Sequence, residues 1–212
     1  MSSRCVGDIS VYREIVLDPQ ACDGETESEN DVRQAFGDSQ RPLEVDIGSG
    51  KGRFLLARAS AHPSVNFLGI ERQYGRVCKT AKKVRRAELK NVRLARMEAF
   101  EGIGKLLTSE SVSVFYIFYP DPWPKRRHHR RRLVNPQFMD VLHNRLIHGG
   151  VIHFASDHVD YAKVVAGIFR ADRRFEEIPP LIPNEDERTD FELLFAAMGK
   201  AANRISVRKL SE

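Results

Sequence analysis

The sequence has few cysteines and no long apolar run, and each shortage argues against a class of protein. Its three cysteines, Cys5, Cys22 and Cys78, include no CxxC pair and cannot all pair with one another. This pattern argues against a disulfide framework and against a structural zinc site. No apolar segment approaches the ~20 residues of a membrane span, and the initial MSSRCVGDISVYREIV lacks the apolar core of a secretory signal. We therefore expect a cytoplasmic protein without a membrane anchor.

Positive charge is in excess and is concentrated in one segment. The 212 residues carry a formal net charge of +5, and the sequence pI is about 9.2. Between Lys125 and Arg132, six of the eight residues are Lys or Arg and the other two are His. Such a cluster favours an anionic partner, for which nucleic acid is the first candidate and a membrane surface the second.

Polar and acidic residues separate the start of the chain from a regular pattern that begins near Pro42. We expect residues 1–41 to form an N-terminal extension with an acidic surface segment (residues 23–40), and residues 42–212 to form one domain. Beyond Pro42, apolar runs predict strands near residues 43–47, 65–71, 91–97, 111–118, 149–156 and 204–208, with helices between them. This alternation predicts an α/β fold whose mostly parallel sheet is covered by helices on both faces, with the last strand at its edge.

A glycine loop, DIGSGKG, follows the first strand of the domain and precedes a helix. Gly48, Gly50 and Gly52 allow a sharp turn and a close approach of the backbone to a ligand. The spacing is GxGxG rather than the GxGxxG of dinucleotide-binding proteins, and an acid, Asp46, stands two residues before the first glycine. These details favour a ligand with a positive group over a pyrophosphate, although a tight strand-to-helix turn would use the same glycines.

Two further acids follow the next strands. Glu71 ends the second predicted strand, where such sheets place an acid that accepts hydrogen bonds from ribose hydroxyls. The alternative is a surface ion pair between Glu71 and Arg72 or another basic residue nearby. Glu98 follows the third strand, where it either accepts from an adenine amino group or is an ordinary helix-start carboxylate. With Asp46, these acids fit S-adenosylmethionine, because that molecule carries a sulfonium and an ammonium where a dinucleotide carries phosphates.

The segment YPDPWPKRRHHRRRLVNP joins an acid and the only tryptophan to the basic run. Asp121 lies between prolines after the apolar run VSVFYIF, so we expect it at the carboxyl end of a strand. Trp123 serves either as a stacking platform for a base or as a structural brace between prolines. The arginines predicted to bind phosphates are Arg126, Arg127, Arg130, Arg131 and Arg132. No Cys or acid cluster accompanies His128 and His129, so no metal is expected.

Two motifs near the end of the chain have simple structural readings. Asp157 is placed to cap a helix that begins at His158. Thr189 and Glu192 have the T-x-x-E spacing of a capping box. From the residues alone, helix capping is the simpler interpretation of both motifs, and it is compatible with ligand binding at the same helix starts.

Together these motifs resemble those of the tRNA (guanine-N(7)-)-methyltransferases, enzymes with the Rossmann-like class I methyltransferase fold. The resemblance extends from about Pro42 to Arg208. It includes DIGSGKG, FLGIER, PDPWPKRRHHRRRLV, ASD at Ala155–Asp157 and TDFE at Thr189–Glu192. PDPW followed by lysine and a basic, histidine-containing run is its most specific part. The resemblance implies a doubly wound, mostly parallel sheet with a reversed edge strand, S-adenosylmethionine as cofactor and tRNA as partner.

The resemblance also implies roles for individual residues. The cofactor-binding residues would be Asp46, Gly48, Gly50, Gly52, Glu71, Glu98 and Asp121. Asp121 would in addition be catalytic. The residues assigned to the tRNA would be Lys125, Asp157, Thr189, Asp190, Phe191 and Glu192. The implied reaction is methylation of nitrogen-7 of the guanosine at position 46, in the variable loop of tRNA.

The chain departs from the family pattern at two acids and at its start. Asp46 stands where the family often has Glu, and Glu98 where it commonly has Asp or Asn. We recognise no basic segment before Pro42. Two alternatives remain open, a methyltransferase that acts on another RNA or on DNA and a nucleic-acid-binding protein that has lost catalysis. The sequence also leaves open whether the protein is a monomer or a homodimer.

Overall fold

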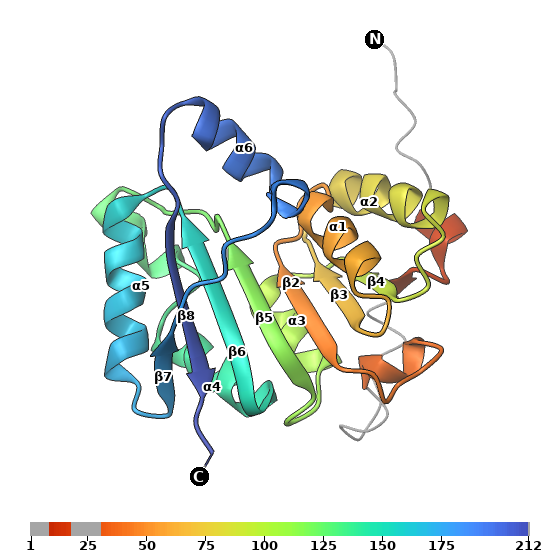
Figure 1. Cartoon of the computed structure of the whole chain (residues 1–212), viewed down its shortest axis with the longest axis horizontal. Helices are drawn as coiled ribbons and strands as arrows, with labels where there is room; N and C mark the ends of the chain where they lie inside the picture. The colour runs from red at the N-terminus through yellow and green to blue at the C-terminus, as the bar shows by residue number, and fades with distance from the viewer. Residues whose placement is uncertain (1–8, 18–30, 212) are drawn as a thin grey trace.

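The computed structural model describes residues 9–17 and 31–211, and its strands form one sheet (Figure 1). Among these residues the sheet has eight strands, in the order β1-β4-β3-β2-β5-β6-β8-β7. The strands are β1 Val16–Leu17, β2 Leu43–Ile47, β3 Asn66–Ile70, β4 Val92–Ala95, β5 Val112–Phe118, β6 Leu146–Ser156, β7 Phe175–Ile178 and β8 Asn203–Lys209. The α-helices are α1 Arg53–Ala61, α2 Tyr74–Arg86, α3 Ala99–Leu106, α4 Pro136–Arg145, α5 Val159–Ala171 and α6 Asp190–Ala197. Short 3₁₀ helices are η1 Ile9–Tyr12, η3 Val32–Ala35, η4 Arg126–Arg131 and η5 Glu185–Glu187.

The sheet is parallel except at one end. Strands β1 to β6 pair in parallel, whereas β8 runs antiparallel to both of its neighbours, β6 and β7. Every residue of β2 and β3 is buried, as expected for central strands with both faces covered. The predicted α/β fold with a mostly parallel sheet is confirmed. The sequence pattern misses β7, because its FEEI has a single buried residue. β7 lies outside the reversed strand β8, so the expectation that the reversed last strand forms the edge of the sheet is wrong, although its reversal is confirmed.

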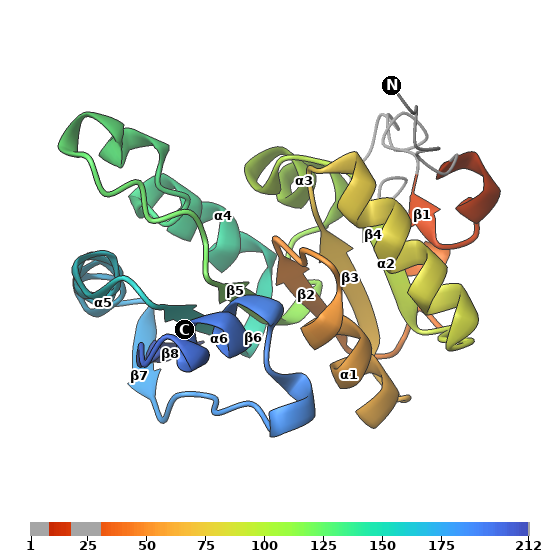
Figure 2. The ribbon, with the colours of Figure 1, turned by 90° about the horizontal axis from the view of Figure 1, so that it is seen from above.

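Helices cover both faces of the sheet (Figures 1 and 2). On one face α1 and α2 contribute Leu55 and Val84 to a buried cluster. On the other face α3, α4 and α5 contribute Ile103, Phe138 and Val165 to a larger cluster. Burial of each such side chain stabilises the fold by about 1.5–3 kcal/mol. Together the two clusters hold the helices against the sheet. No helix in the described part of the chain is long and apolar enough to cross a membrane.

The described residues before Pro42 also pack against the sheet. β1 pairs with β4, and Tyr12 joins the cluster on the α1 and α2 face. Val32 and Phe36 join the cluster on the opposite face. Part of the predicted acidic segment, residues 23–30, lies outside the described residues. We keep Pro42 as the proposed start of the predicted domain, on which the described residues 9–17 and 31–41 pack.

Candidate active site

A cleft opens at the carboxyl ends of β2, β3 and β5, where sheets of this kind bind ligands. It consists of two cavities of about 530 Å³ and 370 Å³. The cavities adjoin, because both are lined by Gly48, Arg76, Phe118 and Phe191. The predicted site residues that line the cleft are Asp46, Gly48, Gly50, Glu71, Glu98, Asp121, Arg131, Thr189, Asp190 and Phe191. The fold therefore brings residues from well-separated segments of the chain to one edge of the sheet.

The glycines of the loop after β2 have two different roles. The N–H groups of Gly48 and Ser49 donate to the carbonyl of Ile70 at 2.8 and 3.1 Å, which turns the loop over the end of β3. Gly48 has a φ of +79°, and a Cβ there would meet no atom within 4 Å, so any side chain would project into the open cleft. Gly52, with a φ of +74°, does not line the cleft, and a Cβ there would overlap the side chain of Thr80. Gly48 thus keeps the cleft open, whereas Gly52 permits close packing behind the loop.

Asp46 and Glu71 place two carboxylates in the cleft. Asp46 is 5% exposed and Glu71 is 6% exposed. Burial, and to a lesser extent the negative charge of Glu71, raises the pKa of Asp46 to about 7. Glu71 accepts hydrogen bonds from the N–H groups of Gly50 (3.1 Å) and Gln73 (2.8 Å) and forms an ion pair of 3.4 Å with Arg76. The cleft therefore favours a positively charged ligand, which would return Asp46 to its ionised form.

Glu98 lies at the rim of the cleft, directly before α3. Its side chain is 64% exposed and forms an ion pair of 3.2 Å with Arg72. The carboxylate makes no capping hydrogen bond to α3. Glu98 thus stands at the start of α3, as the helix-start alternative expected, and it also lines the larger cavity, so both alternatives stay open. The ion pair with Arg72, which was considered for Glu71, belongs to Glu98.

The segment between β5 and η4 forms a strained loop beside the larger cavity. Tyr119 and Trp123 have φ angles of +53° and +42°, in a region that costs a residue with a side chain about 1–3 kcal/mol. The N–H of Tyr119 donates to the carbonyl of Ala155 at 2.8 Å, which ties the start of the loop to β6. Asp121 lies between the two strained residues and is an exposed residue of the cavity lining. Its carboxylate thus faces the cleft from a restrained backbone.

Trp123 has both structural contacts and access to the cleft. The guanidinium of Arg131 lies 5.1 Å from the centre of its ring, and the ring of His128 meets it edge-on with centres 5.6 Å apart. Trp123 and Arg131 also line the larger cavity. The two interpretations of this residue are therefore compatible, because a ring braced in this way still reaches a ligand in the cavity.

The basic run divides into exposed residues and one buried arginine. Lys125, Arg126, Arg127, Arg130 and Arg131 are exposed, and most of them lie on η4, which projects from the sheet beside α4 (Figure 2). Arg132 is only 7% exposed; its Nε donates to the carbonyl of Pro122 at 2.9 Å, and its guanidinium lies 4.8 Å from the ring centre of Tyr161. The prediction that Arg132 contacts phosphate is therefore wrong, because α5 and the PDPW loop enclose its side chain. Within residues 9–17 and 31–211 no His, Cys and acid side chains group in a way that could hold a metal ion.

Arg132 and its exposed neighbour Arg130 offer a matched pair of substitutions. We expect Arg132→Gln to lower the turnover rate and the melting temperature, because the PDPW loop loses its hydrogen bond to Pro122 and its contact with Tyr161. Arg130→Gln should leave the melting temperature unchanged and instead weaken both the binding of the RNA expected as partner and the salt dependence of that binding. Thermal unfolding, together with RNA binding measured at several salt concentrations, distinguishes the two variants. If the two variants behaved alike, the structural role of Arg132 would be refuted.

The residues predicted to contact tRNA near the end of the chain also have structural partners. His158, not Asp157, caps α5, because its Nδ1 accepts the N–H of Tyr161 at 3.3 Å. The carboxylate of Asp157 instead pairs with Lys200 at 2.9 Å. The predicted cap at Asp157 is therefore wrong by one residue.

The expected capping box at the start of α6 is half formed. Thr189 accepts the N–H of Glu192 at 3.0 Å. The carboxylate of Glu192 does not return to Thr189, because it pairs with Arg204 and, at 3.9 Å, with Arg188. A complete capping box is instead formed by Asn184 and Glu187 at η5. Thr189 and Phe191 reach the cleft, whereas Glu192 anchors α6 to β8.

Comparisons with known proteins agree with this geometry. Residues 40–204 match the family described as "Putative methyltransferase". The tRNA (guanine-N(7)-)-methyltransferase of Halorhodospira halophila is 39% identical over 158 residues, which cover 71% of this chain and 68% of that protein. The enzyme of the same name from Nocardia farcinica is 36% identical over 149 residues, which cover 70% of this chain and 55% of that protein. The matched region thus spans about half to two thirds of the length of these relatives.

A solved structure shows the same fold at low sequence identity. The aminoglycoside resistance methyltransferase NpmB1 superposes with a TM-score of 0.58 at 15% identity, over 80% of this chain and 88% of that one. This likeness concerns the arrangement of the sheet and helices. The sequence matches are closer, and by them the chain belongs to the tRNA (guanine-N(7)-)-methyltransferase family.

Proposed function

We propose that this protein transfers the methyl group of S-adenosylmethionine to nitrogen-7 of the guanosine at position 46, in the variable loop of tRNA. The observation that carries the proposal is the position of the PDPW loop, which places Asp121 at a cleft with two buried carboxylates and continues directly into an exposed basic helix. We also propose that the protein acts in the cytoplasm.

The residues of the cleft fit the cofactor. S-adenosylmethionine carries a sulfonium and an ammonium group. Asp46 is a buried carboxylate whose pKa is raised to about 7, so a cation beside it would stabilise its ionised form. Glu71 adds a second negative charge, and Gly48 leaves the space beside them open. We assign Asp46, Glu71, Glu98 and the loop glycines Gly48 and Gly50 to the cofactor.

The chain's own residues position the base rather than deprotonate it. The cofactor supplies a methyl group that its sulfonium already activates. Guanine nitrogen-7 has no proton and keeps a lone pair in the ring plane, so no general base is needed, and the ring gains positive charge as the bond forms. The carboxylate of Asp121 stabilises that charge and accepts hydrogen bonds from guanine N–H groups. Trp123 and Arg131 line the same cavity and offer surfaces on which a base stacks.

Cofactor affinity should rise with pH between about 6 and 8. Asp46 in the free protein is protonated below its pKa of about 7, whereas a cationic ligand binds the ionised carboxylate. Each pH unit below that pKa should therefore weaken binding by up to about tenfold, with a proton released on binding. Calorimetry in two buffers with different ionisation enthalpies measures the affinity and the number of protons released on binding. Asp46→Asn should bind weakly at every pH. An affinity of the unsubstituted protein that does not change over this range contradicts the role of Asp46.

The proposed reaction is tested by supplying labelled S-adenosylmethionine with unmodified tRNA and, in a separate reaction, with RNA other than tRNA, and by mapping the labelled nucleotide and atom. We expect 7-methylguanosine at position 46. Label in an RNA other than tRNA would favour the alternative of a methyltransferase with a different substrate. Cofactor binding without transfer to any RNA would favour a protein that has lost catalysis.

A further inference from the structure

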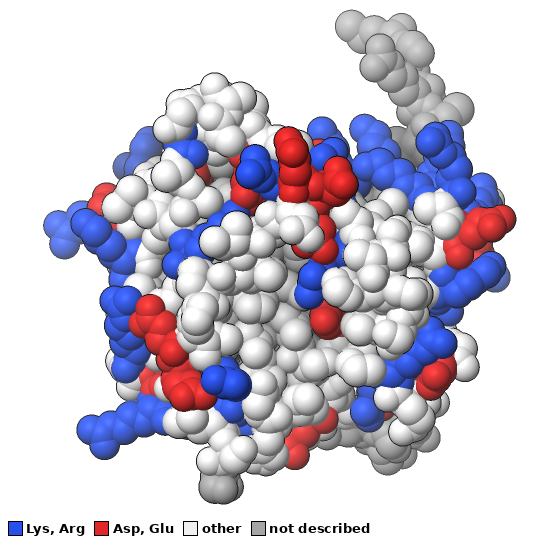
Figure 3. Space-filling view, viewed as in Figure 1, with Lys and Arg blue, Asp and Glu red and all other residues white. Residues whose placement is uncertain are grey.

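Helix α2 presents a second cationic surface that the basic run of the sequence does not include. Its sequence, YGRVCKTAKKVRR, contains no acid. Val77, Cys78, Thr80, Ala81 and Val84 are buried, whereas the lysines and the two last arginines of the helix are exposed. In Figure 3 the blue side chains of Lys and Arg gather over this helix. The amphipathic pattern thus separates an apolar face from a face of positive charge.

This surface forms a hollow lined only by cations. The hollow has a volume of about 260 Å³. Its lining residues are Lys51, Lys79, Lys82, Lys83 and Arg86. The Nζ of Lys83 donates to the carbonyl of Lys51 at 2.7 Å, which joins the helix to the glycine loop. We call these five residues the α2 surface.

Helix stability does not explain the α2 surface. Cations in the last turn of a helix gain about 0.3–1 kcal/mol from the helix dipole, and Lys83 and Arg86 lie there. Lys79 and Lys82 lie earlier, and Lys51 lies outside the helix. Lys79 with Lys83, and Lys82 with Arg86, are like-charge pairs four residues apart, each of which destabilises a helix by about 0.2–0.5 kcal/mol. An arrangement that costs stability indicates an anion that covers it.

The α2 surface borders the cleft. Lys51 belongs to the glycine loop and lines the smaller cavity, and Arg76 of α2 lines both cavities. Figure 2 shows α2 and the segment that carries η4 on either side of the carboxyl ends of the central strands. An RNA whose base enters the cleft would extend over both of these charged regions.

We propose that the α2 surface is a second phosphate-binding surface for the RNA substrate, separate from the exposed residues Lys125–Arg131. The proposal rests on the proposed function. An RNA backbone fits better than an anionic membrane, because surface helices that bind membranes carry exposed apolar side chains beside their cations. The outward face of α2 has none, since its aliphatic residues Val77, Ala81 and Val84 are buried.

The test neutralises two cations on α2. Lys79→Gln with Lys82→Gln should weaken tRNA binding about tenfold or more at ~0.1 M salt and reduce the slope of log affinity against log salt by about two. The matched control is Lys163→Gln with Arg173→Gln, which removes the same charge from exposed positions on α5 and just after it. The control should change neither quantity. Cofactor affinity should remain at the unsubstituted value in both variants, because all four side chains are exposed. The melting temperature should be unchanged in the control and unchanged or slightly raised in the α2 variant, because that variant loses two like-charge pairs.

Two results would overturn the proposal. One is a tRNA affinity and salt slope of the α2 variant equal to those of the control. The other is an α2 variant that loses binding to phosphatidylserine vesicles while its tRNA binding is unchanged, which would assign the surface to a membrane. Mapping the methylated atom with the unsubstituted protein tests the proposed function separately. RNA binding that depends on Lys79 and Lys82 would support the surface even if the label were found on another atom.

Discussion

Asp121→Asn should lower the rate of methyl transfer by about 10²- to 10³-fold at saturating cofactor and tRNA, the loss typical when a preorganised electrostatic contact is removed. The substitution keeps the size and shape of the side chain. It removes the negative charge that opposes the charge developing on guanine, and it replaces an acceptor by a donor that faces guanine N–H groups. Because Asp121 is exposed and asparagine has nearly the same size, the change should leave the fold intact.

Single-turnover kinetics with labelled cofactor measure this effect without interference from product release. The control is Asp160→Asn, which removes an exposed carboxylate from the first turn of α5, outside the cleft. Both variants should bind tRNA nearly as well as the unsubstituted protein. A rate of Asp121→Asn within about twofold of the control would show that orientation by shape, and not charge, is what the loop supplies.

The features that were predictable from sequence are those that local patterns determine. Alternating apolar and amphipathic runs predicted the sheet, since period and length distinguish strands from helices. The glycines and acids after β2 and β3 were predicted to meet at one edge because parallel strands end there. The N-cap at Thr189 was predicted correctly because it depends on a contact only three residues away.

The features that sequence missed depend on contacts between distant segments. Arg132 stands in a run of arginines, and its burial is decided by Tyr161, which α5 brings to it. The carboxylate of Asp157 pairs with Lys200, which lies after α6. The α2 surface was also missed, because buried residues interrupt its cations along the helix and Lys51 joins them only in the fold. A contiguous run of charge is visible in a sequence, whereas a helical face of charge is not.

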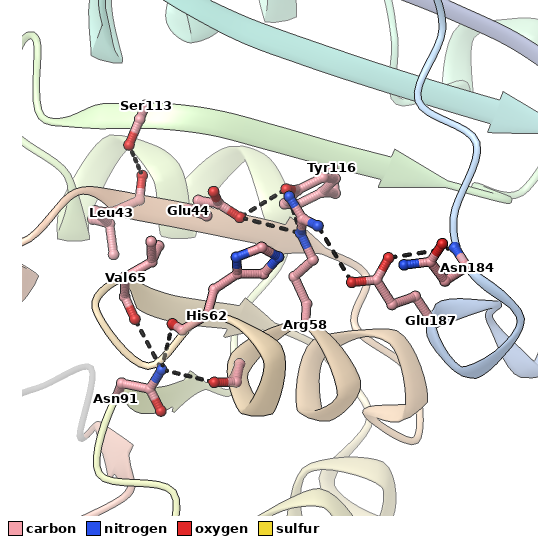
Figure 4. A network of polar contacts seen from close by, with 11 residues as sticks. Leu43, Glu44, Arg58, His62, Val65, Asn91, Ser113, Tyr116, Asn184 and Glu187 are labelled. Atoms are coloured by element: carbon pink, nitrogen blue, oxygen red, sulfur yellow. Dashed lines mark hydrogen bonds and ion pairs between the residues drawn. The ribbon is translucent and has the colours of Figure 1, made fainter.

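A buried polar network explains how the start of α6 is held at the cleft (Figure 4). The guanidinium of Arg58, on α1, donates to Tyr116 at 3.1 Å and to Glu187 at 3.2 Å, and it lies 3.7 Å from Glu44. The hydroxyl of Tyr116 donates to Glu44 at 2.7 Å. Burial and the charge of Glu44 raise the pKa of Tyr116, which keeps this hydroxyl protonated. Arg58 therefore joins β2, β5 and η5, directly before Thr189.

Arg58→Met should lower the free energy of unfolding by about 3–5 kcal/mol, the cost of leaving a buried charge without its partner. Glu44 is 9% exposed and Glu187 is 5% exposed, so both buried carboxylates would lose their cation, whose side chain is itself only 19% exposed. Activity should fall as well, because η5 leads directly to Thr189 and Phe191 in the cleft. Urea unfolding and methyl-transfer kinetics measure the two effects.

Two further variants separate charge pairing from simple loss of packing. Arg170→Met breaks an ion pair with Glu177 whose side chains are 63% and 44% exposed, so it should have little effect on unfolding. Arg58→Met combined with Glu44→Gln and Glu187→Gln should recover much of the lost stability, because no uncompensated charge remains. If the triple variant were less stable than Arg58→Met alone, the proposed role of charge would be wrong. The directed hydrogen bonds of the network, and not its charges, would then hold α1 to η5.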